Sequence, residues 1–205
     1  PPWSVVKKEI GEEFFMKKII EVRWHGRGGQ GAVTASKLLA TSALAEDKYI
    51  QAFPEYGPER MGAPIQSFTR ISDMPIRIHC HVTNPNMVAV LDPTLIGPVD
   101  ITEGLTDDGI IVINTSESPA QIRNKLQLKG RKVFTVDASK IALEELGRPM
   151  PNTPMIGALI KATELLKLDN VIDDIKKKFA GKFSQKIIDG NVNAIKRAYQ
   201  EVESE

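Results

Sequence analysis

The chain of 205 residues contains one cysteine, Cys80, and this scarcity excludes two kinds of site. A disulfide within the chain cannot form, and an iron–sulfur cluster, which generally takes four cysteine thiolates, lacks its ligands. Long apolar runs are also absent, since none approaches the ~20 residues that a membrane-spanning helix needs. Neither sign of charge dominates, because 27 Lys and Arg stand against 26 Asp and Glu. No overall field therefore favours nucleic acid or a membrane surface as a partner.

The start of the chain lacks the continuous apolar segment of a secretory signal, because lysines and glutamates interrupt residues 1–15. We therefore expect a cytoplasmic protein. Met16 comes shortly before the first predicted strand and suggests an alternative start, so residues 1–16 are interpreted as an N-terminal extension. Residues 17–205 are interpreted as one α/β domain, since this length and an apolar content of 41% suffice for one good core.

Strand and helix patterns alternate along the rest of the chain, which is typical of parallel βαβ units. An apolar run at 19–24 predicts the first strand, and small residues and leucines at 32–45 predict the helix after it. Unbroken apolar runs at 87–91, 109–114 and 132–136 favour strands that are covered on both faces. We expect an α/β fold with an open, mostly parallel sheet and helices on both faces, similar to Rossmann and flavodoxin folds.

Two stretches interrupt this order. Residues 65–71 and 76–82 each alternate apolar and polar side chains around a turn, and together they predict an inserted β-hairpin. In the second stretch Cys80 would be buried, and its neighbours His79 and His81 would share the opposite face. A metal-binding pair of histidines is conceivable, but a half-exposed strand explains the pattern better. We predict no metal site.

The end of the chain is predicted to be helical. Thr153 as N-cap and Pro154 at the first helical position indicate a helix to about residue 168. Further helices are predicted at 170–180 and 184–203. The last one carries an apolar stripe at helical spacing, for which we favour core packing over a partner groove. The stripe consists of Phe183, Ile187, Ile188, Val192, Ile195, Tyr199 and Val202.

The segment between the first strand and its helix matches G-x-G-x-x-G, from Gly26 to Gly31. A glycine turn in this position lets backbone N–H groups at the helix start face an anion, usually a phosphate. Arg27 adds a guanidinium suited to bidentate phosphate contact. Asp92 and Asn114, which end two predicted strands, could line the same crevice or cap turns. A tight turn without a ligand is the alternative. The candidate phosphate contacts are Gly26, Arg27, Gly28, Gly29, Gln30 and Gly31.

No set of catalytic residues is evident. Ser36 and Ser67 lie in predicted regular elements, without the glycine-flanked elbow of hydrolases. His25 ends a strand, where a structural role is more common. A free-standing dehydrogenase needs a ribose-binding acid roughly 20 residues after the glycines, and Glu55 is near that distance but lies in an irregular, proline-rich stretch. We predict no catalytic residue and keep a free-standing nucleotide-binding protein as an alternative.

That irregular stretch, residues 51–64, contains three prolines and two glycines and suits neither helix nor strand. Long irregular loops are often functional. With the glycine turn, this loop makes the chain resemble a known family, the gamma subunits or gamma domains of 2-oxoacid:ferredoxin oxidoreductases. The resemblance runs from about Lys17 to near the C-terminus and rests on separated motifs in one order. The motifs are Trp24–Gly31, Gln51–Arg60, Gly62–Pro64 and Asn152–Met155.

The resemblance implies a role inside a larger enzyme. Such enzymes decarboxylate a 2-oxoacid on thiamine diphosphate with Mg, pass electrons through [4Fe-4S] clusters to ferredoxin, and release the acyl-CoA. It implies alpha, beta and delta partner subunits that carry the thiamine site and the clusters, with coenzyme A as a substrate of the complex. This chain would bind no cofactor alone and would be inactive alone. Tyr56, Glu59 and Arg60 are predicted to face the partners, and the glycine turn to meet coenzyme A phosphates.

The loop also indicates a substrate. Residues 53–60 followed by Met61, Gly62 and Ala63 resemble the pyruvate branch of the family. We therefore expect a pyruvate:ferredoxin oxidoreductase, which converts pyruvate, coenzyme A and oxidised ferredoxin to acetyl-CoA, CO2 and reduced ferredoxin. Enzymes for 2-oxoisovalerate can share gamma chains with it, so that substrate remains the alternative.

Overall fold

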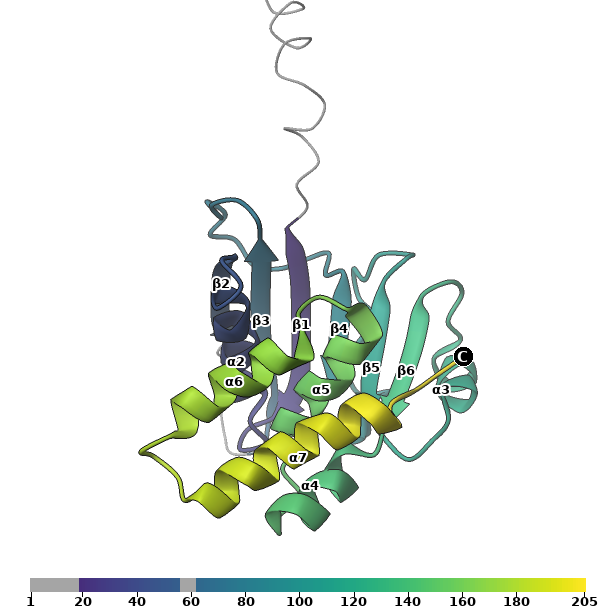
Figure 1. The fold of residues 1–205 in the computed structure, drawn as a ribbon. Coiled ribbons are helices and arrows are strands. Elements are labelled where there is room, and N and C mark those ends of the chain that lie inside the picture. Colours follow the sequence, from purple (N-terminus) through teal and green to yellow (C-terminus); the bar gives the residue numbers. More distant parts are fainter. Residues whose placement is uncertain (1–18, 56–61) are drawn as a thin grey trace, which may run out of the picture.

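The structure is a computed structural model and describes residues 19–55 and 62–205. Seven strands form one sheet in the order β2-β3-β1-β4-β5-β6-β7 (Figure 1). The parallel part is β1-β4-β5-β6, whereas β3 runs antiparallel to both β1 and β2, and β7 runs antiparallel to β6. The strands are β1 (Ile20–Arg27), β2 (Tyr49–Glu55), β3 (Pro64–Ser72), β4 (Met87–Val90), β5 (Ile110–Asn114), β6 (Lys132–Val136) and β7 (Glu203–Ser204).

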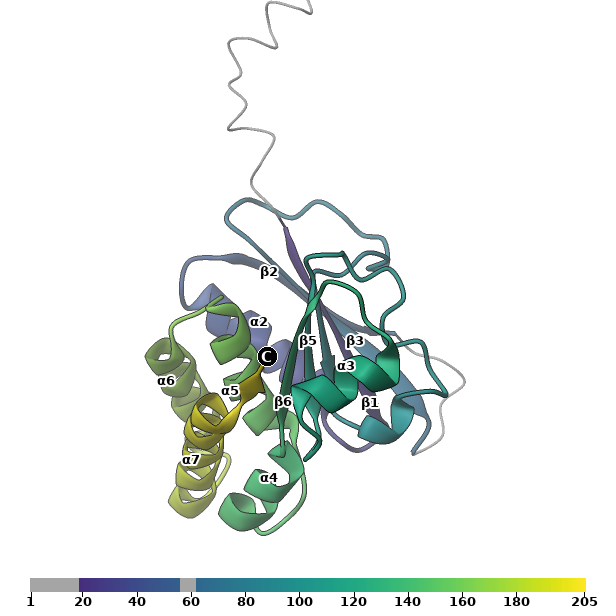
Figure 2. The ribbon, with the colours of Figure 1, turned by 90° about the vertical axis from the view of Figure 1, so that its right-hand side faces the viewer.

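Helices cover both faces of this sheet, so the expected α/β architecture is confirmed. One face is covered by α2 and α4 together with the C-terminal helices α5, α6 and α7, and α3 lies on the opposite side (Figure 2). We call the first the helical face and the second the loop face. The helical segments are α2 (Ala32–Leu44), η2 (Pro93–Leu95), α3 (Pro119–Leu126), α4 (Ala138–Leu146), α5 (Asn152–Thr163), α6 (Leu168–Phe179) and α7 (Gln185–Glu201).

The helical face holds the larger apolar core. Val22 and Trp24 of β1 are fully buried there, packed with residues of α2, α5 and α7. The indole N–H of Trp24 donates to Thr69 Oγ1 at 3.1 Å, so its one polar atom is satisfied. Helices α5 and α7 approach closely because Gly157 has no side chain: a Cβ there would lie 2.2 Å from the carbonyl oxygen of Ile195.

The loop face is covered mainly by irregular segments and by α3. Over β4, β5 and β6 its core is apolar, with Val88, Val90 and Ile111 packed against residues from the β4–β5 connection and α3. Over β1 and β3 it is polar instead, because Arg23 and Arg70 lie there and are almost completely buried. The two halves of this face are therefore stabilised by different kinds of interaction.

The predicted hairpin at 65–82 is wrong in its second half. Residues 65–71 do form a strand, β3, but its hairpin partner is the preceding strand β2, and its other neighbour is β1. The segment 76–82 has no strand structure. Its alternation reflects a loop that rests on β3, where Arg70 donates to the carbonyl oxygens of Ile78 and Cys80. Strand β2 ends at Glu55, inside the proline-rich stretch whose composition suits neither helix nor strand.

The same error affects Cys80, which is exposed rather than buried. Without a strand, no pleat turns its side chain toward a core. His79 and His81 are exposed as well. Among the described residues, no group of three or more His, Cys, Asp or Glu side chains is arranged to hold a metal ion.

The number and order of the three C-terminal helices are confirmed, but the predicted N-cap and end of α5 are wrong. Helix α5 begins at Asn152 with Pro151 as its N-cap, because the hydroxyl of Thr153 donates to Asn191 instead of capping the helix. It also ends earlier than predicted, at Thr163. In the stripe of α7, buried Ile195 confirms core packing, whereas Phe183 and Ile187, which are 45% and 39% exposed, do not reach the core.

Candidate functional site

The glycine turn lies where the sheet changes direction. From β1 the chain passes through α2 to β2 and β3 on one side, while β4, β5 and β6 follow on the other. In open α/β sheets, the crevice at the carboxyl ends of the strands beside such a switch point is the usual ligand site. Here the glycine turn follows β1 and Asp92 follows β4. Asn114, at the end of β5, instead donates to the carbonyl oxygen of Leu91 and the hydroxyl of Ser139.

Two of the glycines are required by the backbone. Gly29 and Gly31 have φ of +96° and +84°, in the left-handed region that side chains disfavour. Gly31 is also the N-cap of α2, and a Cβ there would lie 2.7 Å from Nδ2 of Asn152. Gly26 serves close packing, since its Cβ would lie 3.2 Å from the Cβ of Ala32. The turn thus brings the start of α2 directly against the end of β1.

Some N–H groups of this turn are used within the chain. Gly28 donates to the carbonyl oxygen of Ala63 at 3.0 Å, and the Arg27 N–H donates to Gln30 Oε1 at 2.8 Å. Gln30 N–H closes the turn onto the Arg27 carbonyl. The first helical N–H group with an acceptor in the described chain is that of Ala35, which bonds to Gly31. The N–H groups before it, from Gly31 to Thr34, therefore remain available to an anion at the positive end of α2.

Arg27 is held by three neighbours. Its Nε donates to Asp92 Oδ2 at 3.1 Å, its Nη2 to Thr94 Oγ1 at 3.0 Å, and its Nη1 to the carbonyl oxygen of Gly62 at 3.2 Å. The side chain is 31% exposed. A guanidinium has five N–H donors, so one on each terminal nitrogen stays free for an external acceptor. Arg27 therefore both joins the ends of β1 and β4 and presents donors to solvent.

Asp92 organises this group of side chains. It accepts from Gln30 Nε2 at 2.6 Å and from both the N–H and the hydroxyl of Thr94, at 2.9 and 2.7 Å. Burial works against its charged form, but the hydrogen bonds from Thr94 and Gln30 and the charge of Arg27 outweigh it and hold the pKa of Asp92 below its ordinary value. The carboxylate is thus ionised near neutral pH and fixes the orientation of Arg27.

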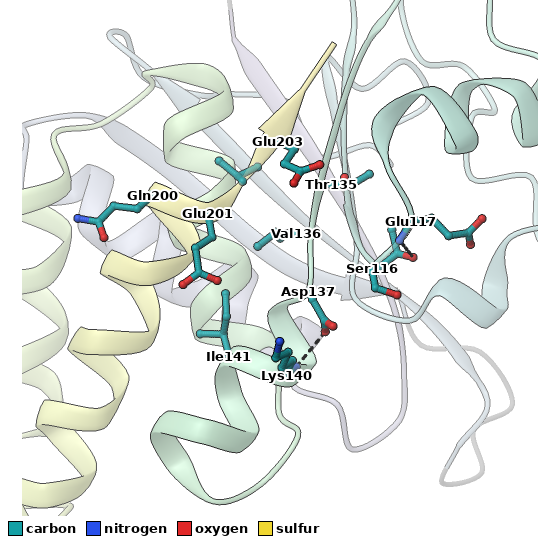
Figure 3. Close-up of a pocket in the computed structure, with 12 residues that line it drawn as sticks. Ser116, Glu117, Thr135, Val136, Asp137, Lys140, Ile141, Gln200, Glu201 and Glu203 are labelled. Atoms are coloured by element: carbon teal, nitrogen blue, oxygen red, sulfur yellow. Dashed lines mark hydrogen bonds between the residues drawn. The ribbon is translucent and has the colours of Figure 1, made fainter.

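A second crevice at the same sheet edge has the opposite character. This acidic cavity, of about 550 Å³, lies beyond the carboxyl ends of β5 and β6 and is bounded by the end of α7 and β7 (Figure 3). Glu117, Asp137, Glu201 and Glu203 line it, with Lys140 as the cation. Lys125 pairs with Glu117, and Arg197 pairs with Glu201. The remaining charge does not favour a phosphate, so an anionic ligand is better placed at the glycine turn.

The sequence predicts part of this site. The turn and Asp92 are identifiable from it, and the structure brings them together, whereas Thr94 and the Gly62 carbonyl were not predicted. The Asp92-Pro93-Thr94 order after a strand was a usable signal, because Asp and Thr commonly bond to nearby backbone groups at such turns. Tyr56, Glu59 and Arg60 lie outside the described residues. In the described part of the chain, no helix is both long and apolar enough to cross a membrane.

Fold and site together define a class: a Rossmann-like α/β protein with a glycine turn and an adjacent arginine at its switch point. Comparison with known proteins identifies the family. The model of the pyruvate ferredoxin/flavodoxin oxidoreductase family matches residues 21–201, and the chain belongs to that family.

Individual relatives agree over nearly the whole chain. "Pyruvate synthase subunit PorC" of Thermotoga maritima is 50% identical over 186 residues, which is 91% of this chain and 96% of that protein. The "pyruvate/ketoisovalerate oxidoreductases common subunit gamma" of Pyrococcus furiosus is 49% identical over 90% of this chain and 98% of its own length. A crystal structure of pyruvate oxidoreductase subunit PORC from Thermotoga maritima superposes with a TM-score of 0.81 at 46% identity, covering 92% of this chain and 99% of that one.

Proposed function

We propose that this chain is the gamma subunit of a pyruvate:ferredoxin oxidoreductase. The observation that carries the proposal is the 50% identity to a pyruvate synthase subunit over 91% of the chain. The complex would convert pyruvate, coenzyme A and oxidised ferredoxin to acetyl-CoA, CO2 and reduced ferredoxin. Thiamine diphosphate and the iron–sulfur clusters would reside in the alpha, beta and delta partners, because the single cysteine of this chain cannot ligate a cluster.

Within that complex, the proposed task of this chain is to hold the phosphates of coenzyme A at the glycine turn. Two features support this task. The N–H groups from Gly31 to Thr34 have no acceptor in the described chain and lie at the positive end of a 13-residue helix. Arg27, with its free terminal N–H donors, lies beside them, braced by Asp92. Gly26, Gly28, Gly29 and Gln30 would shape this turn. That Tyr56, Glu59 and Arg60 face the partner subunits stays a prediction.

The test is Arg27→Ala in the complete, assembled complex. Losing one charge-assisted phosphate contact costs about 1.5–3 kcal/mol, so the KM for coenzyme A should rise about tenfold to a hundredfold. The KM for pyruvate should change much less, because pyruvate reacts in the partner subunits. Arg27→Lys, which keeps the charge but loses the planar fork, should have an intermediate effect.

Arg77→Ala is the matched control, since Arg77 is exposed in the loop between β3 and β4, away from the turn. It should leave both KM values unchanged. An unaltered coenzyme A dependence in an assembled Arg27→Ala complex would mean that the turn is structural and that the subunit acts as a scaffold.

A second substrate is favoured by one relative. The printed name of the Pyrococcus furiosus relative describes a gamma subunit common to pyruvate and ketoisovalerate oxidoreductases. This chain could therefore serve a 2-oxoisovalerate enzyme as well. Mass spectrometry of the native complexes that copurify with it decides the question, since sharing requires two different sets of alpha and beta subunits.

A further inference from the structure

A third cavity opens among the helices of the helical face. It is separate from the acidic cavity. We call it the basic cavity; its volume is about 560 Å³, within the range of small-molecule sites. Its walls come from α2, from the connection between α4 and α5, and from the turn between α6 and α7, which lies at the left of Figure 1. Arg27 does not line it. Three kinds of group around it each point to the same class of ligand.

The first is an apolar wall. Phe179 and Phe183 pack edge to face, with ring centroids 5.0 Å apart, and Leu38 and Ile187 extend the surface. Phe183 and Ile187 are nevertheless 45% and 39% exposed. Their helical spacing predicts core packing, but in the structure both side chains line the cavity. A ligand with an apolar body would remove this surface from water.

The second is a group of cations. Arg148, Lys178 and Lys182 line the cavity. Lys178 is paired with Asp174, but Arg148 and Lys182 form no ion pair with any residue in the described parts of the chain. Among the described residues, no carboxylate lines the cavity. The uncompensated charge around it is therefore positive.

The third is a buried amide with a free donor. Asn152 is 8% exposed and lines the cavity. Its Oδ1 accepts from the N–H of Thr153 at 2.9 Å, which fixes the orientation of the amide. Its NH2 group has no acceptor among the residues that the structure describes. Because that group lies against Gly31, it adds to the unpaired N–H donors at the start of α2, and Thr34 of that helix also borders the cavity.

We propose that the basic cavity binds an amphipathic carboxylate, a small organic anion with an apolar body. The carboxylate accepts from the Asn152 amide and is neutralised by Arg148 and Lys182. The body packs on the wall formed by Phe179 and Phe183. This site adjoins the coenzyme A contacts proposed above, since Asn152 lies against Gly31. The carboxylate uses the Asn152 amide and the two cations instead of Arg27 and the backbone N–H groups of α2, so the two ligands can bind at the same time.

The test is calorimetric titration of the full chain with octanoate, which has this chemistry. We expect saturable binding of one octanoate per chain. Arg148→Ala and Lys182→Ala should each weaken binding about two- to fivefold, the effect of one exposed ion pair. Phe183→Asp should weaken it at least about tenfold, because it places a like charge on the apolar wall. Lys129→Ala, at an exposed lysine beyond α3 on the loop face, is the matched control and should change nothing.

Three further titrations separate the contributions. Octanol lacks the charge that both cations contact and should bind about four- to 25-fold more weakly. Acetate lacks the apolar body and should not saturate. Coenzyme A should not displace octanoate. The proposal is overturned if octanoate does not saturate, if octanol binds equally well, or if Lys129→Ala weakens binding as much as Lys182→Ala. Displacement by coenzyme A would also overturn it, by making the cavity part of the coenzyme A site. Circular dichroism of each variant verifies that the fold is retained.

Discussion

The two faces of the sheet bury different chemistry. On the helical face, Val22, Trp24 and Ile71 share one core with residues of α2, α4, α5, α6 and α7. The polar groups buried there are mostly small hydroxyls such as Ser36 and Ser67. On the loop face, the strands β1 and β3 bury charged and titratable side chains under irregular chain: Arg23, His25 and Arg70. Both faces exclude water, but only on the second do buried charged side chains supply hydrogen bonds to the covering loops.

The difference explains why one face carries helices and the other loops. A helix satisfies its own backbone groups, so it can cover an apolar surface without help from the sheet. A loop leaves carbonyl oxygens unpaired, and buried arginines supply donors for them. Arg70 bonds to the carbonyls of Ile78 and Cys80, and Arg23 bonds to those of Ile101 and Glu103. The loop face should therefore lose most when one cation is removed.

Removing Arg70 should give the largest effect. Its Nε lies 2.7 Å from Glu21, its side chain is 1% exposed, and its guanidinium also stacks 5.3 Å from the ring of Phe53. Breaking a buried ion pair by removing one partner costs about 3–5 kcal/mol, because the other charge is left uncompensated. We expect Arg70→Ala to lower the free energy of unfolding by this amount in urea denaturation.

The control is Lys48→Ala, which removes a pair of similar length, 2.6 Å, between Lys48 and Asp73 at the surface. That change should cost less than about 1 kcal/mol. Adding Glu21→Gln to Arg70→Ala should recover part of the loss, because it removes the uncompensated charge. Equal losses in the buried and surface variants would contradict the distinction between the two faces.

The helical face should instead be sensitive to added volume. In Gly157→Ala the new methyl group would meet the backbone of α7, which cannot rotate away as a side chain would. Overpacking of this kind typically costs about 1–3 kcal/mol. Thermal unfolding should show a lower Tm, whereas Asn124→Ala on the exposed side of α3 should leave it nearly unchanged. A neutral Gly157→Ala would show that α5 and α7 can separate without loss of packing.

The sequence predicts the regular strands and helices better than the polar contacts of the loop face. The strands of the parallel part follow from unbroken apolar runs, and the glycine turn follows from its spacing, because both signals are local. The segment 76–82 misled the prediction: its alternation is a strand pattern, but what fixes it is Arg70, a residue on another element. Thr153 was expected to cap a helix and bonds to Asn191 on α7 instead. Partners distant in sequence leave no periodic signal, so the polar contacts of the site and of the loop face could not be derived.

The smallest expected effect is a loss of folding stability at acidic pH, caused by the buried His25 on the loop face. His25 is 1% exposed, and its Nε2 accepts from Arg23 Nε at 3.0 Å, which requires a neutral ring. Burial and the charge of Arg23 lower the pKa of His25 to about 3. In the unfolded chain the pKa is about 6.5, so below that pH the unfolded state binds a proton that the folded state does not. Stability should therefore fall as the pH decreases from 6.5 towards 3.

Between pH 7 and pH 5.5 the resulting loss is about 1 kcal/mol. His25→Gln has no group that titrates there, and its amide oxygen can still accept from Arg23. Urea denaturation at both pH values should therefore show a smaller loss for this variant than for the parent chain. If the two chains lose the same stability over this interval, the buried histidine is not what makes the loop face sensitive to acid. The charged groups that act on its pKa, Arg23 and Asp100, would then be the next to examine.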